Sequence, residues 1–410
     1  MKITTVKGTN DYLPEEVRLR DYLQTRILET YIDAGFERIM TPAVEDIENL
    51  DKSDGGDNLN LIFKILKRGD KLTKAMNSGD TNNLCDMGLR YDLTLPLSRY
   101  YANNREKLVL PAKCIQIDKV YRAERPQKGR LREFVQCDID IIGSSSINSE
   151  IELIHTTAKA LLSLDIKDFT VKINDRRILR SLLSNVGFAD DQLDSVCITF
   201  DKLDKIGAEG VVAELTDKGF DAAAVAKFGE VIAKPLTLES VKEVCGSEAA
   251  ESVETIIQSV KQLAEGMYSI KFDISLVRGQ GYYTGTVFEI VSDKFRGSIA
   301  GGGRYDNLIG KFTGENIPAV GFSIGFERIF ALLTESGYNI PDAKKKIALL
   351  YDKSDVIAAI KEAEKLRSEY DVVIYEKPKK LSKYLDKIQS KGYYGFCFMG
   401  EEIRALKNEG

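Results

Sequence analysis

The sequence predicts an α+β fold in which an antiparallel sheet is flanked by helices and joined to a helical insertion and a small C-terminal α/β domain. Between 276 and 333, β-branched runs are separated by glycine turns, a pattern typical of antiparallel strands. Residues 148–265 have helical spacing with one strand-like stretch. Beyond residue 344, apolar strands alternate with helices. A chain of 410 residues is too long for one core, so several domains are expected.

The N-terminal region is predicted to begin with one helix and one strand. Residues 15–35 read as a helix that ends near Ala34 and Gly35, and 36–46 read as a strand. Pro42 inside this strand indicates an edge or interface position, because proline cannot donate a hydrogen bond to a sheet. Residues 51–83 are rich in Asp, Asn, Gly and Lys around a hairpin candidate, "LIFKILKRGDKL", and are predicted to form a flap.

The next strands are predicted to place polar side chains on one face. Residues 88–104 read as a strand that runs into a helix, with Pro96 near the helix start. In 112–143 two strands flank the turn-forming "RPQKG" loop. Alternation in the second strand gives an apolar face of Val135, Cys137, Ile139 and Ile141, and an opposite face of Arg132, Phe134, Gln136, Asp138 and Asp140. Carboxylates in the middle of a strand predict a polar pocket.

These segments suggest a domain order with an interrupted core. We expect the core to consist of 1–147 and 266–336, separated by a mostly helical insertion at 148–265. A linker near 337–344 then leads to a separate short α/β domain at 344–410.

Composition narrows the class of protein. The chain is 43% hydrophobic and 30% charged, as expected of a soluble globular protein, and it has no apolar run long enough to cross a membrane. Its N-terminus lacks the apolar segment of a signal peptide. Six scattered cysteines, with no C-x-x-C pair, argue against zinc and disulfides and favour the reducing cytoplasm.

The single histidine and the charge distribution exclude several kinds of site. One histidine argues against a Ser-His-Asp triad and a multi-histidine metal site. His155 lies in a predicted helix, where a surface or packing role is favoured over that of a lone base. The net charge is −5, but residues 341–410 carry 15 Lys and Arg against 12 Asp and Glu. A polyanionic partner would therefore be met locally.

A cationic segment, "YRAERPQKGRLREF" (121–134), predicts an anion site. Its five cations repel one another, and arginine presents a planar fork that matches phosphate oxygens. Arg122, Arg278 and Arg328 stand near glycine or tyrosine, and Arg328 falls in the first turn of a helix, which also favours an anion. Three convergent arginines would suit a triphosphate. The alternative is that each pairs with a local acid, such as Glu124, Glu289 or Glu327.

The glycine run "AGGGRYD" (300–306) reads as a turn between a strand and a helix. It matches neither the Walker loop nor the G-x-G-x-x-G motif. A tight turn and a close approach of the backbone to a ligand are both consistent with it.

In chain order, seven segments together resemble the histidyl-tRNA synthetase family of class II aminoacyl-tRNA synthetases. "FERIMTPAVED" (36–46), "VYRAERPQKGRLREFVQCDIDIIG" (120–143) and "GFSIGFERIFALL" (321–333) match class II motifs 1, 2 and 3. The other segments are "KGTNDYLP" (7–14), "LRYDLTLPLSRY" (89–100), "LVRGQGYYTGTVFE" (276–289) and "GGGRYDNLI" (301–309). The resemblance implies a class II synthetase-type sheet and covers essentially the whole chain.

The resemblance also implies residue roles. Arg122 and Arg278 would be catalytic, holding the α-phosphate and the attacking carboxylate. ATP would be bound by Arg122, Glu124, Arg130 and Arg328. Asp92, Thr94 and Gln136 would receive the α-ammonium group of histidine. The rest of the histidine pocket would be Asp140, Arg278, Tyr282, Tyr283 and Tyr305, with Asp140 and Tyr282 on either side of the imidazole.

The implied reaction is ATP-dependent activation of histidine, followed by transfer to tRNA(His). Mg²⁺ would accompany the triphosphate, although no separate protein metal site is predicted. Pairing through motif 1 would give a homodimer, consistent with Pro42 on an interface strand.

Three features depart from the family pattern. Gln280 and Gly281 stand where an apolar residue and an acid are usual, and Val135 stands where histidine or tyrosine is frequent. The C-terminal domain is short of the last strand and helix expected for anticodon binding, although Lys383, Lys387 and Lys391 form a possible basic stripe.

Two other functions remain open from the sequence. One is the non-catalytic, histidine-sensing regulatory subunit of ATP phosphoribosyltransferase, which generally lacks the full arginine set of motif 2 and the anticodon-binding domain. The other is a synthetase-like paralogue acting on something other than tRNA. Retention of Arg122, Arg130, Arg278 and Arg328 favours the ligase.

Overall fold

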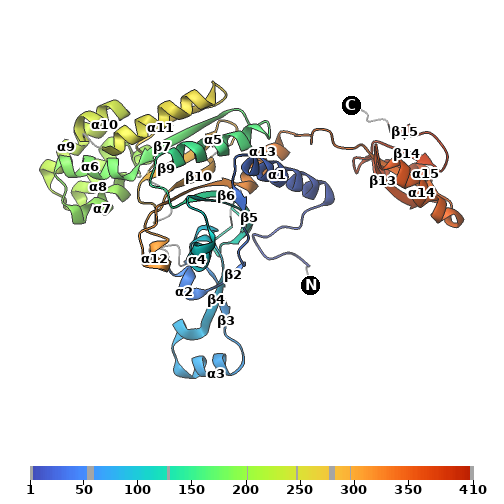
Figure 1. Cartoon of the computed structure of the whole chain (residues 1–410), viewed down its shortest axis with the longest axis horizontal. Helices are drawn as coiled ribbons and strands as arrows, with labels where there is room; N and C mark the ends of the chain where they lie inside the picture. Colours follow the sequence, from blue (N-terminus) through green and yellow to red (C-terminus); the bar gives the residue numbers. More distant parts are fainter. Residues whose placement is uncertain are drawn as a thin grey trace. The chain divides into compact units, whose positions relative to one another are not determined.

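A computed structural model describes residues 3–52, 60–126, 130–200, 202–245, 248–276, 282–295 and 297–406. The chain divides into two compact units, 1–338 and 339–410, shown in Figure 1. Within the described residues, no helix is both long and apolar enough to cross a membrane.

An eight-stranded sheet forms the centre of the first unit. Its order is β1 (Glu37–Arg38), β5 (Ala112–Tyr121), β6 (Glu133–Ile142), β11 (Ala319–Gly325), β10 (Ser298–Arg304), β9 (Thr286–Ser292), β7 (Phe169–Asp175) and β8 (Ser269–Phe272). The middle pairs are antiparallel, as predicted, whereas the outermost pairs β1–β5 and β7–β8 are parallel. The sheet is therefore mixed at both edges.

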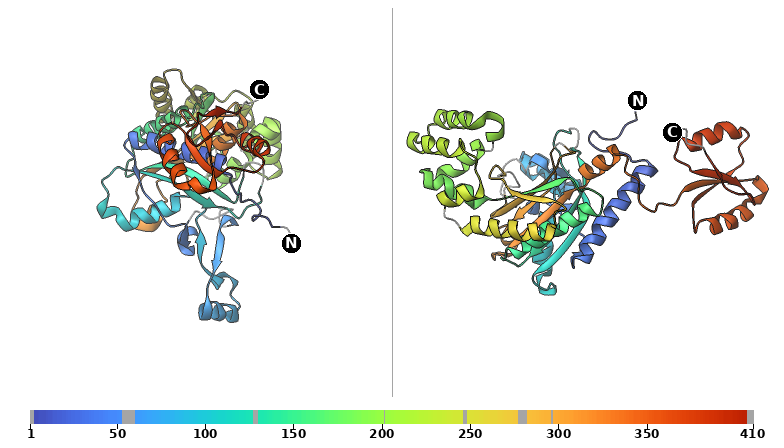
Figure 2. Two further views of the ribbon diagram at one scale, coloured as in Figure 1. Left: turned by 90° about the vertical axis from the view of Figure 1, so that its right-hand side faces the viewer. Right: turned by 90° about the horizontal axis from the view of Figure 1, so that it is seen from above.

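Helices cover one face of this sheet (Figure 2). They are α1 (Pro14–Asp33), α5 (Asn148–Leu162), α11 (Glu248–Ala264) and α13 (Phe326–Glu335). The predicted alternation in β6 is confirmed, because Val135, Cys137, Ile139 and Ile141 are buried in the core beneath these helices. The other face of β6 is consequently free to line a cavity.

The predicted strand at 36–46 is wrong as a single element. Two short strands form instead, β1 and β2 (Val44–Asp46), and they join different sheets. Pro42 lies between these two strands, where the backbone makes no sheet hydrogen bond that would need an N–H group. The first helix matches its prediction and ends before Gly35, whose φ of +83° suits glycine.

The hairpin predicted at 61–72 is also wrong. β3 (Phe63–Leu66) pairs with β4 (Cys85–Leu89), and 69–78 form helix α3 (Gly69–Ser78) between them. Together with β2 and the short helix α2 (Ile47–Leu50), these elements make a separate three-stranded lobe, seen below the main sheet in Figure 1. Residues 53–59 of the predicted flap lie outside the described residues.

Residues 148–265 contribute to two layers. α5 packs on the sheet and β7 is one of its strands, while α11 returns along the same face. The lobe at the side of the sheet in Figure 1 is built from α6 (Arg176–Val186), α7 (Leu193–Phe200), α8 (Leu203–Asp217), α9 (Ala222–Ile232) and α10 (Leu238–Cys245). The mostly helical character is as expected, but the segment begins inside the sheet layer.

The glycine run was predicted to be a turn, and that prediction is wrong. Gly301, Gly302 and Gly303 lie inside strand β10, between β9 and β11. A Cβ on Gly302 would overlap the Gly321 carbonyl and the Phe288 ring. Close packing of three strands, rather than a reversal of the chain, requires these glycines.

The second unit forms a small α/β sheet of its own. β12 (Lys346–Tyr351), α14 (Val356–Leu366), β13 (Asp371–Glu376), α15 (Leu381–Gln389) and β14 (Gly395–Phe398) alternate as predicted, and the three strands are parallel. A two-residue strand, β15 (Arg404–Ala405), pairs antiparallel with β14. The predicted lysine stripe is shortened, because Lys391 lies beyond the end of α15.

Candidate active site

A cavity of about 650 Å³ lies on the face of the sheet opposite the covering helices. Strands β6, β9, β10 and β11 supply its floor, and α4 (Thr94–Asn104) contributes its first residue. All predicted site residues that the structure describes line it: Asp92, Thr94, Arg122, Glu124, Arg130, Gln136, Asp140, Tyr282, Tyr283, Tyr305 and Arg328. Arg278, Gln280 and Gly281 lie outside the described residues. The assignment of each site residue to a particular group of ATP or histidine stays a prediction.

Three carboxyl groups are buried in the cavity. Asp92, Asp138 and Asp140 are each no more than 4% exposed. Burial raises the pKa of Asp92 to about 6 and that of Asp140 to about 7, and it raises the pKa of Asp138 well above its ordinary value. Buried carboxyl groups with raised pKa values are typical of functional sites.

Tyrosines surround the carboxyl groups, and one of them holds Asp140 in place. Tyr305 Oη donates to Asp140 Oδ1 at 2.6 Å, and Tyr282 Oη donates to Thr94 Oγ1 at 3.5 Å. The rings of Tyr282 and Tyr283 are 5.1 Å apart between centroids, and those of Tyr282 and Tyr305 are 6.0 Å apart. This aromatic wall next to a carboxyl group suits a small planar ring with N–H donors.

Two glycines, which have no side chain, leave space for Asp140 and Tyr283. A Cβ at Gly321 would overlap Asp140 Oδ1, and one at Gly303 would stand 3.0 Å from the Tyr283 ring. Both glycines lie opposite each other on β10 and β11. Gly303 of the glycine run therefore leaves space for the Tyr283 ring, and Gly301 and Gly302 line the cavity.

Arginines line the same cavity. Arg122 Nε donates to Tyr91 O at 3.1 Å, and its guanidinium group lies 4.9 Å from the Phe134 ring centroid. Arg328 donates to the backbone oxygen of Ser298 and, at 2.9 Å, to Ser298 Oγ. Burial and the nearby charges of Arg130 and Arg122 lower the pKa of Arg328. The three cations are thus close enough to repel one another, as an anion site requires.

Among the described residues, the alternative pairing with a local acid is found for neither Arg122 nor Arg328, and Arg278 lies outside the described residues. Arg130 lies 3.6 Å from Glu124, but Glu327 accepts from Arg20 at 2.6 and 2.8 Å instead of from its neighbour Arg328. In the described part of the chain, no carboxylate forms an ion pair with Arg122 or Arg328. Glu327 also accepts from Val135 N at 3.2 Å and Tyr12 Oη at 3.4 Å.

Sequence reasoning missed several residues that line the cavity. Ser323 and Glu289 lie in matched segments but were given no role in ligand binding, and Lys172 and Asp273 lie in no motif. Pairing of β11 with β6 and of β7 with β9 brings Ser323, Lys172 and Glu289 to the cavity. Asp138 could have been found, because it shares strand parity with Gln136 and Asp140.

Three buried acceptor atoms in the cavity lack hydrogen-bond partners among the described residues. Asp92 Oδ2, Gln136 Oε1 and Asp138 Oδ1 are buried and make no hydrogen bond to any described residue. Buried acceptors are rarely left unsatisfied, so a ligand rich in N–H groups fits the cavity.

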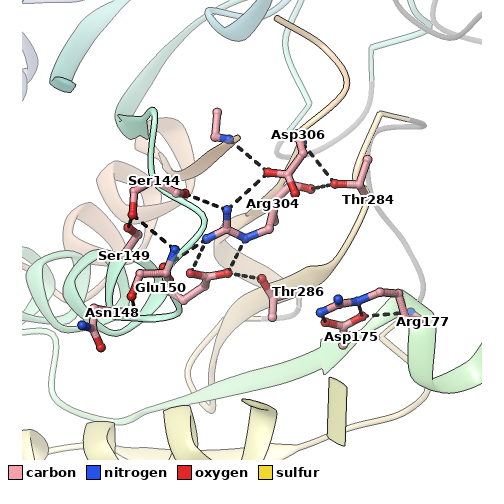
Figure 3. Close-up of polar contacts among 12 residues, drawn as sticks. Ser144, Asn148, Ser149, Glu150, Asp175, Arg177, Thr284, Thr286, Arg304 and Asp306 are labelled. Carbon is pink, nitrogen blue, oxygen red and sulfur yellow. Dashed lines mark hydrogen bonds and ion pairs between the residues drawn. The ribbon is translucent and has the colours of Figure 1, made fainter. Parts of the chain in front are cut away.

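A buried ion pair supports one wall of the cavity (Figure 3). Arg304 donates to Glu150 at 2.7 and 2.6 Å, and Thr286 Oγ1 donates to the same carboxylate at 2.8 Å. Arg304 also donates to Ser144 O and lies 3.3 Å from Asp306. The network fixes the end of β10 immediately before Tyr305.

His155 lies outside the cavity lining. Its Nδ1 is 3.3 Å from Tyr268 Oη on the helix-covered side, in keeping with the predicted packing role. Over the described ranges, no cluster of three or more His, Cys, Asp or Glu is arranged to hold a metal ion.

Comparisons with known proteins point to one family. The model of the family described as "Histidyl-tRNA synthetase" matches residues 8–329. The histidine–tRNA ligase of Leifsonia xyli subsp. xyli is 42% identical, with 98% of this chain and 97% of the relative covered. That of Christiangramia forsetii is 34% identical, with 97% and 92% covered.

Solved structures agree. The histidyl-tRNA synthetase from Nostoc sp. PCC 7120 superposes with a TM-score of 0.79 at 27% identity, covering 97% of this chain and 91% of that one. A Bacillus halodurans protein described as an ATP phosphoribosyltransferase regulatory subunit/histidyl-tRNA synthetase has the same TM-score at 21% identity, covering 98% of this chain and 100% of its own. At that identity, the likeness shows a common fold alone.

Proposed function

The chain belongs to the histidyl-tRNA synthetase family, and from this premise we propose how its cavity works. It is a histidine–tRNA ligase, which activates histidine with ATP and transfers it to tRNA. The observation that carries the proposal is that one cavity holds both a group of arginines and a set of buried carboxyl groups beside tyrosine rings. The first suits a polyphosphate and the second suits a cationic amino acid.

ATP is assigned to the cationic side chains. Arg122 and Arg328 offer guanidinium groups without a competing carboxylate in the described chain, and Arg130 offers one that can leave Glu124. We assign Arg122 to the α-phosphate, Arg328 to the γ-phosphate and Glu124 to the adenine amino group. The Phe134 ring, already beside Arg122, provides a surface on which a base can stack.

Histidine is assigned to the carboxyl groups and tyrosines. Asp92, Thr94 and Gln136 would receive the α-ammonium group. Asp140, held by Tyr305, would accept from one ring nitrogen, and Tyr282 would contact the other side of the imidazole, with Tyr283 completing the wall. Sites that pair both ring nitrogens discriminate strongly against analogues that lack them.

The activation step needs positioning more than proton transfer. The histidine carboxylate attacks the α-phosphorus, a new C–O–P bond forms and pyrophosphate leaves with the electron pair of the broken P–O bond. Arg122, with Arg278 from the undescribed segment, would align the two anions and neutralise their charge. In the second step the terminal ribose hydroxyl of tRNA displaces AMP from the adenylate.

Mg²⁺ is proposed to enter with ATP rather than to occupy a preformed protein site. Mg²⁺ commonly takes one or two carboxylates together with substrate phosphates. Glu289 lines the cavity and its charge acts on Arg328, so one oxygen donor is available beside the proposed γ-phosphate position. When bound, the ion would supply neutralisation of phosphate charge.

We also propose a homodimer and a cytoplasmic location. β1 is an edge strand of the large sheet, and Met40, two residues beyond its end, is 73% exposed. A second copy of the chain would cover this edge. Unit 339–410 is proposed to bind the anticodon region, with Lys383 and Lys387 exposed along α15.

Pyrophosphate exchange tests the ligase function against the regulatory alternative. Purified protein with Mg²⁺-ATP and labelled pyrophosphate should incorporate label into ATP only when histidine is present. Histidine binding without exchange would favour the regulatory subunit. Exchange without charging of tRNA(His) would locate the defect in the C-terminal unit.

A further inference from the structure

The N-terminal segment 5–13, here called the N-terminal strap, is assigned to no ligand by the proposed function. It includes most of the "KGTNDYLP" segment and begins with a tight turn. The backbone N and the Oγ1 of Thr9 donate to Val6 O at 3.0 and 2.8 Å, and Thr5 Oγ1 donates to Thr9 O at 3.0 Å. Gly8 is the third residue of this turn, with a φ of +89° that favours glycine. The strap therefore has a defined shape before α1 begins.

Two contacts tie the N-terminal strap to different walls of the cavity. At one end, Tyr12 Oη donates at 3.4 Å to Glu327 Oε2 on α13, the helix that also carries Arg328. At the other end, Gly8 O accepts from Arg132 N at 2.7 Å. Arg132 directly precedes β6. The strap thus joins the helix of the proposed γ-phosphate site to the strand that carries the polar floor of the cavity.

Arg132 links the strap to two residues proposed to bind ATP. Its backbone oxygen accepts from Arg122 N at 2.8 Å, and its Nε donates to Glu124 O at 3.1 Å. Arg122 and Glu124 line the cavity, whereas Arg132 is not among the described residues that line it. The hydrogen bonds of Arg132 therefore hold the backbone of residues that face the ligand, and a displacement of Arg132 would move them.

The strap packs closely against this part of the chain. A Cβ added to Gly8 would stand 2.7 Å from Pro126 Cγ and 3.0 Å from Arg132 Cγ, which is closer than ordinary van der Waals contact. Pro126 lies two residues beyond Glu124. A side chain at residue 8 would therefore displace the chain next to Glu124 and weaken the hydrogen bond from Arg132 to the Glu124 backbone oxygen.

We propose that Gly8 and Arg132 are positioning residues that hold Glu124 where its carboxylate meets the adenine amino group of ATP. The proposal rests on the proposed function, which assigns Glu124 to that group. The N-terminal strap would thereby set the selectivity for adenine, because a site that pairs with an amino group rejects an analogue that lacks it. Loosening the strap should weaken ATP and spare purine riboside 5′-triphosphate, which has the same triphosphate but no amino group on the base.

Gly8→Ala tests the contact between the strap and the loop. It should weaken the binding of Mg²⁺-ATP about 10-fold and change that of purine riboside 5′-triphosphate less than about twofold. Gly35→Ala is the matched control: Gly35 has a φ of +83°, so alanine meets the same backbone strain, but a Cβ there has no heavy atom within 4 Å. Both variants should melt at similarly lowered temperatures, and only Gly8→Ala should lose affinity for ATP.

Arg132→Met tests the link from the strap to Glu124. Methionine retains an unbranched apolar stem and removes the Nε donor to Glu124 O. We expect the same selective result, a loss of about 10-fold for ATP and of less than about twofold for the analogue. A direct contact between Arg132 and a phosphate predicts equal losses instead, because the two nucleotides share the triphosphate.

The experiment is calorimetric titration of the full chain with each nucleotide in the presence of Mg²⁺, with pyrophosphate exchange by the wild type measured in parallel. L-Histidine is titrated as a third ligand, and its affinity should stay within about twofold in every variant, since its pocket lies on the other strands. Thermal melting identifies a variant that fails to fold, and the other variant then decides.

Three results would overturn the proposal: equal losses for the two nucleotides, an unchanged affinity for ATP in both variants, or a wild type that does not prefer ATP over the analogue. The proposed function fails separately. A wild type that prefers ATP but shows no histidine-dependent exchange contradicts ligase activity and leaves the comparison of the two nucleotides valid.

Discussion

Gly321 on β11 is paired with Asp140 on β6, and the space above its Cα is occupied by the Asp140 carboxyl group. A Cβ at Gly321 would overlap Asp140 Oδ1, the atom that accepts the hydrogen bond from Tyr305. A missing side chain on one strand therefore determines where a buried acid stands on the next.

Gly321→Ala should impair histidine recognition more than ATP recognition. The added methyl group would displace Asp140 and break its contact with Tyr305, so we expect KM for histidine to rise at least about 10-fold in pyrophosphate exchange. Gly285→Ala is the matched control, because a Cβ there would stand 3.5 Å from Arg304 Cδ, an ordinary contact. Equal effects of the two substitutions would contradict the role given to Gly321.

Asp140→Asn should stabilise the free protein at alkaline pH. Burial raises the pKa of Asp140 from 3.8 to about 7, so the folded state favours the protonated acid. Its contribution to stability is fully present below about pH 4 and is lost as the pH rises through about 7. We expect the variant to melt at a higher temperature than the wild type at pH 8 and at a similar temperature at pH 4. A difference that did not depend on pH would contradict the assignment.

Arg122→Lys should not preserve activity. Lysine keeps the charge but loses the planar fork that Arg122 holds against Tyr91 O and the Phe134 ring. Exchange should fall about 10²–10³-fold, as is common when one donor to a developing charge is lost. Arg26→Lys is the control, since Arg26 is exposed on α1. Near wild-type exchange by Arg122→Lys would remove Arg122 from the phosphate site.

Glu150→Gln should destabilise the fold strongly. Glu150 and Arg304 form an ion pair with side chains 1% and 8% exposed, and removing one charge leaves the other buried without its partner. Such losses cost about 3–5 kcal/mol, measurable as a lower urea midpoint. Glu29→Gln breaks an exposed pair with Arg26 and should cost less than about 1 kcal/mol. Similar midpoints for both variants would show that the buried pair contributes little.

Met40→Asp should shift the chain from dimer to monomer. Met40 is exposed beside the edge strand β1, and a charge there would have to be desolvated in the proposed interface. Sedimentation velocity measures the change, with Met76→Asp on α3 as a control of similar exposure. A wild type that sediments as a monomer would refute the proposed homodimer.

The sequence predicted the polar floor of the cavity because strand alternation is a local property. Gln136 and Asp140 were assigned to one face by parity alone, and both line the cavity. Arg328 was placed in the first turn of its helix by the apolar periodicity that follows Gly325, and α13 begins at Phe326. These features depend on neighbours within a few residues, so they can be read without tertiary information.

The missed features depend on contacts between distant segments. Ser323 reaches Gln136 across 187 residues and Glu327 reaches Arg20 across 307, and neither pairing leaves a local signal. The glycine run was misread as a turn because glycine is rare inside strands, whereas here space between β9 and β11 selects it. The same limit applies to the strand predicted around Pro42 and to the hairpin predicted where 69–78 form a helix. In both cases the strands are defined by distant sheet partners.

The carboxylate of Glu327 gives the N-terminal helix a greater importance than its place at the start of the chain suggests. Arg20 from α1 neutralises it, and Val135 N and Tyr12 Oη complete its contacts immediately beside Arg328. A fragment that begins after α1 would lack Arg20 and would leave the Glu327 carboxylate at the cavity without this ion-pair partner. A fragment that retains activity must therefore include Arg20. We expect removal of α1 from the N-terminus to destabilise the fold, and activity to be lost as a result.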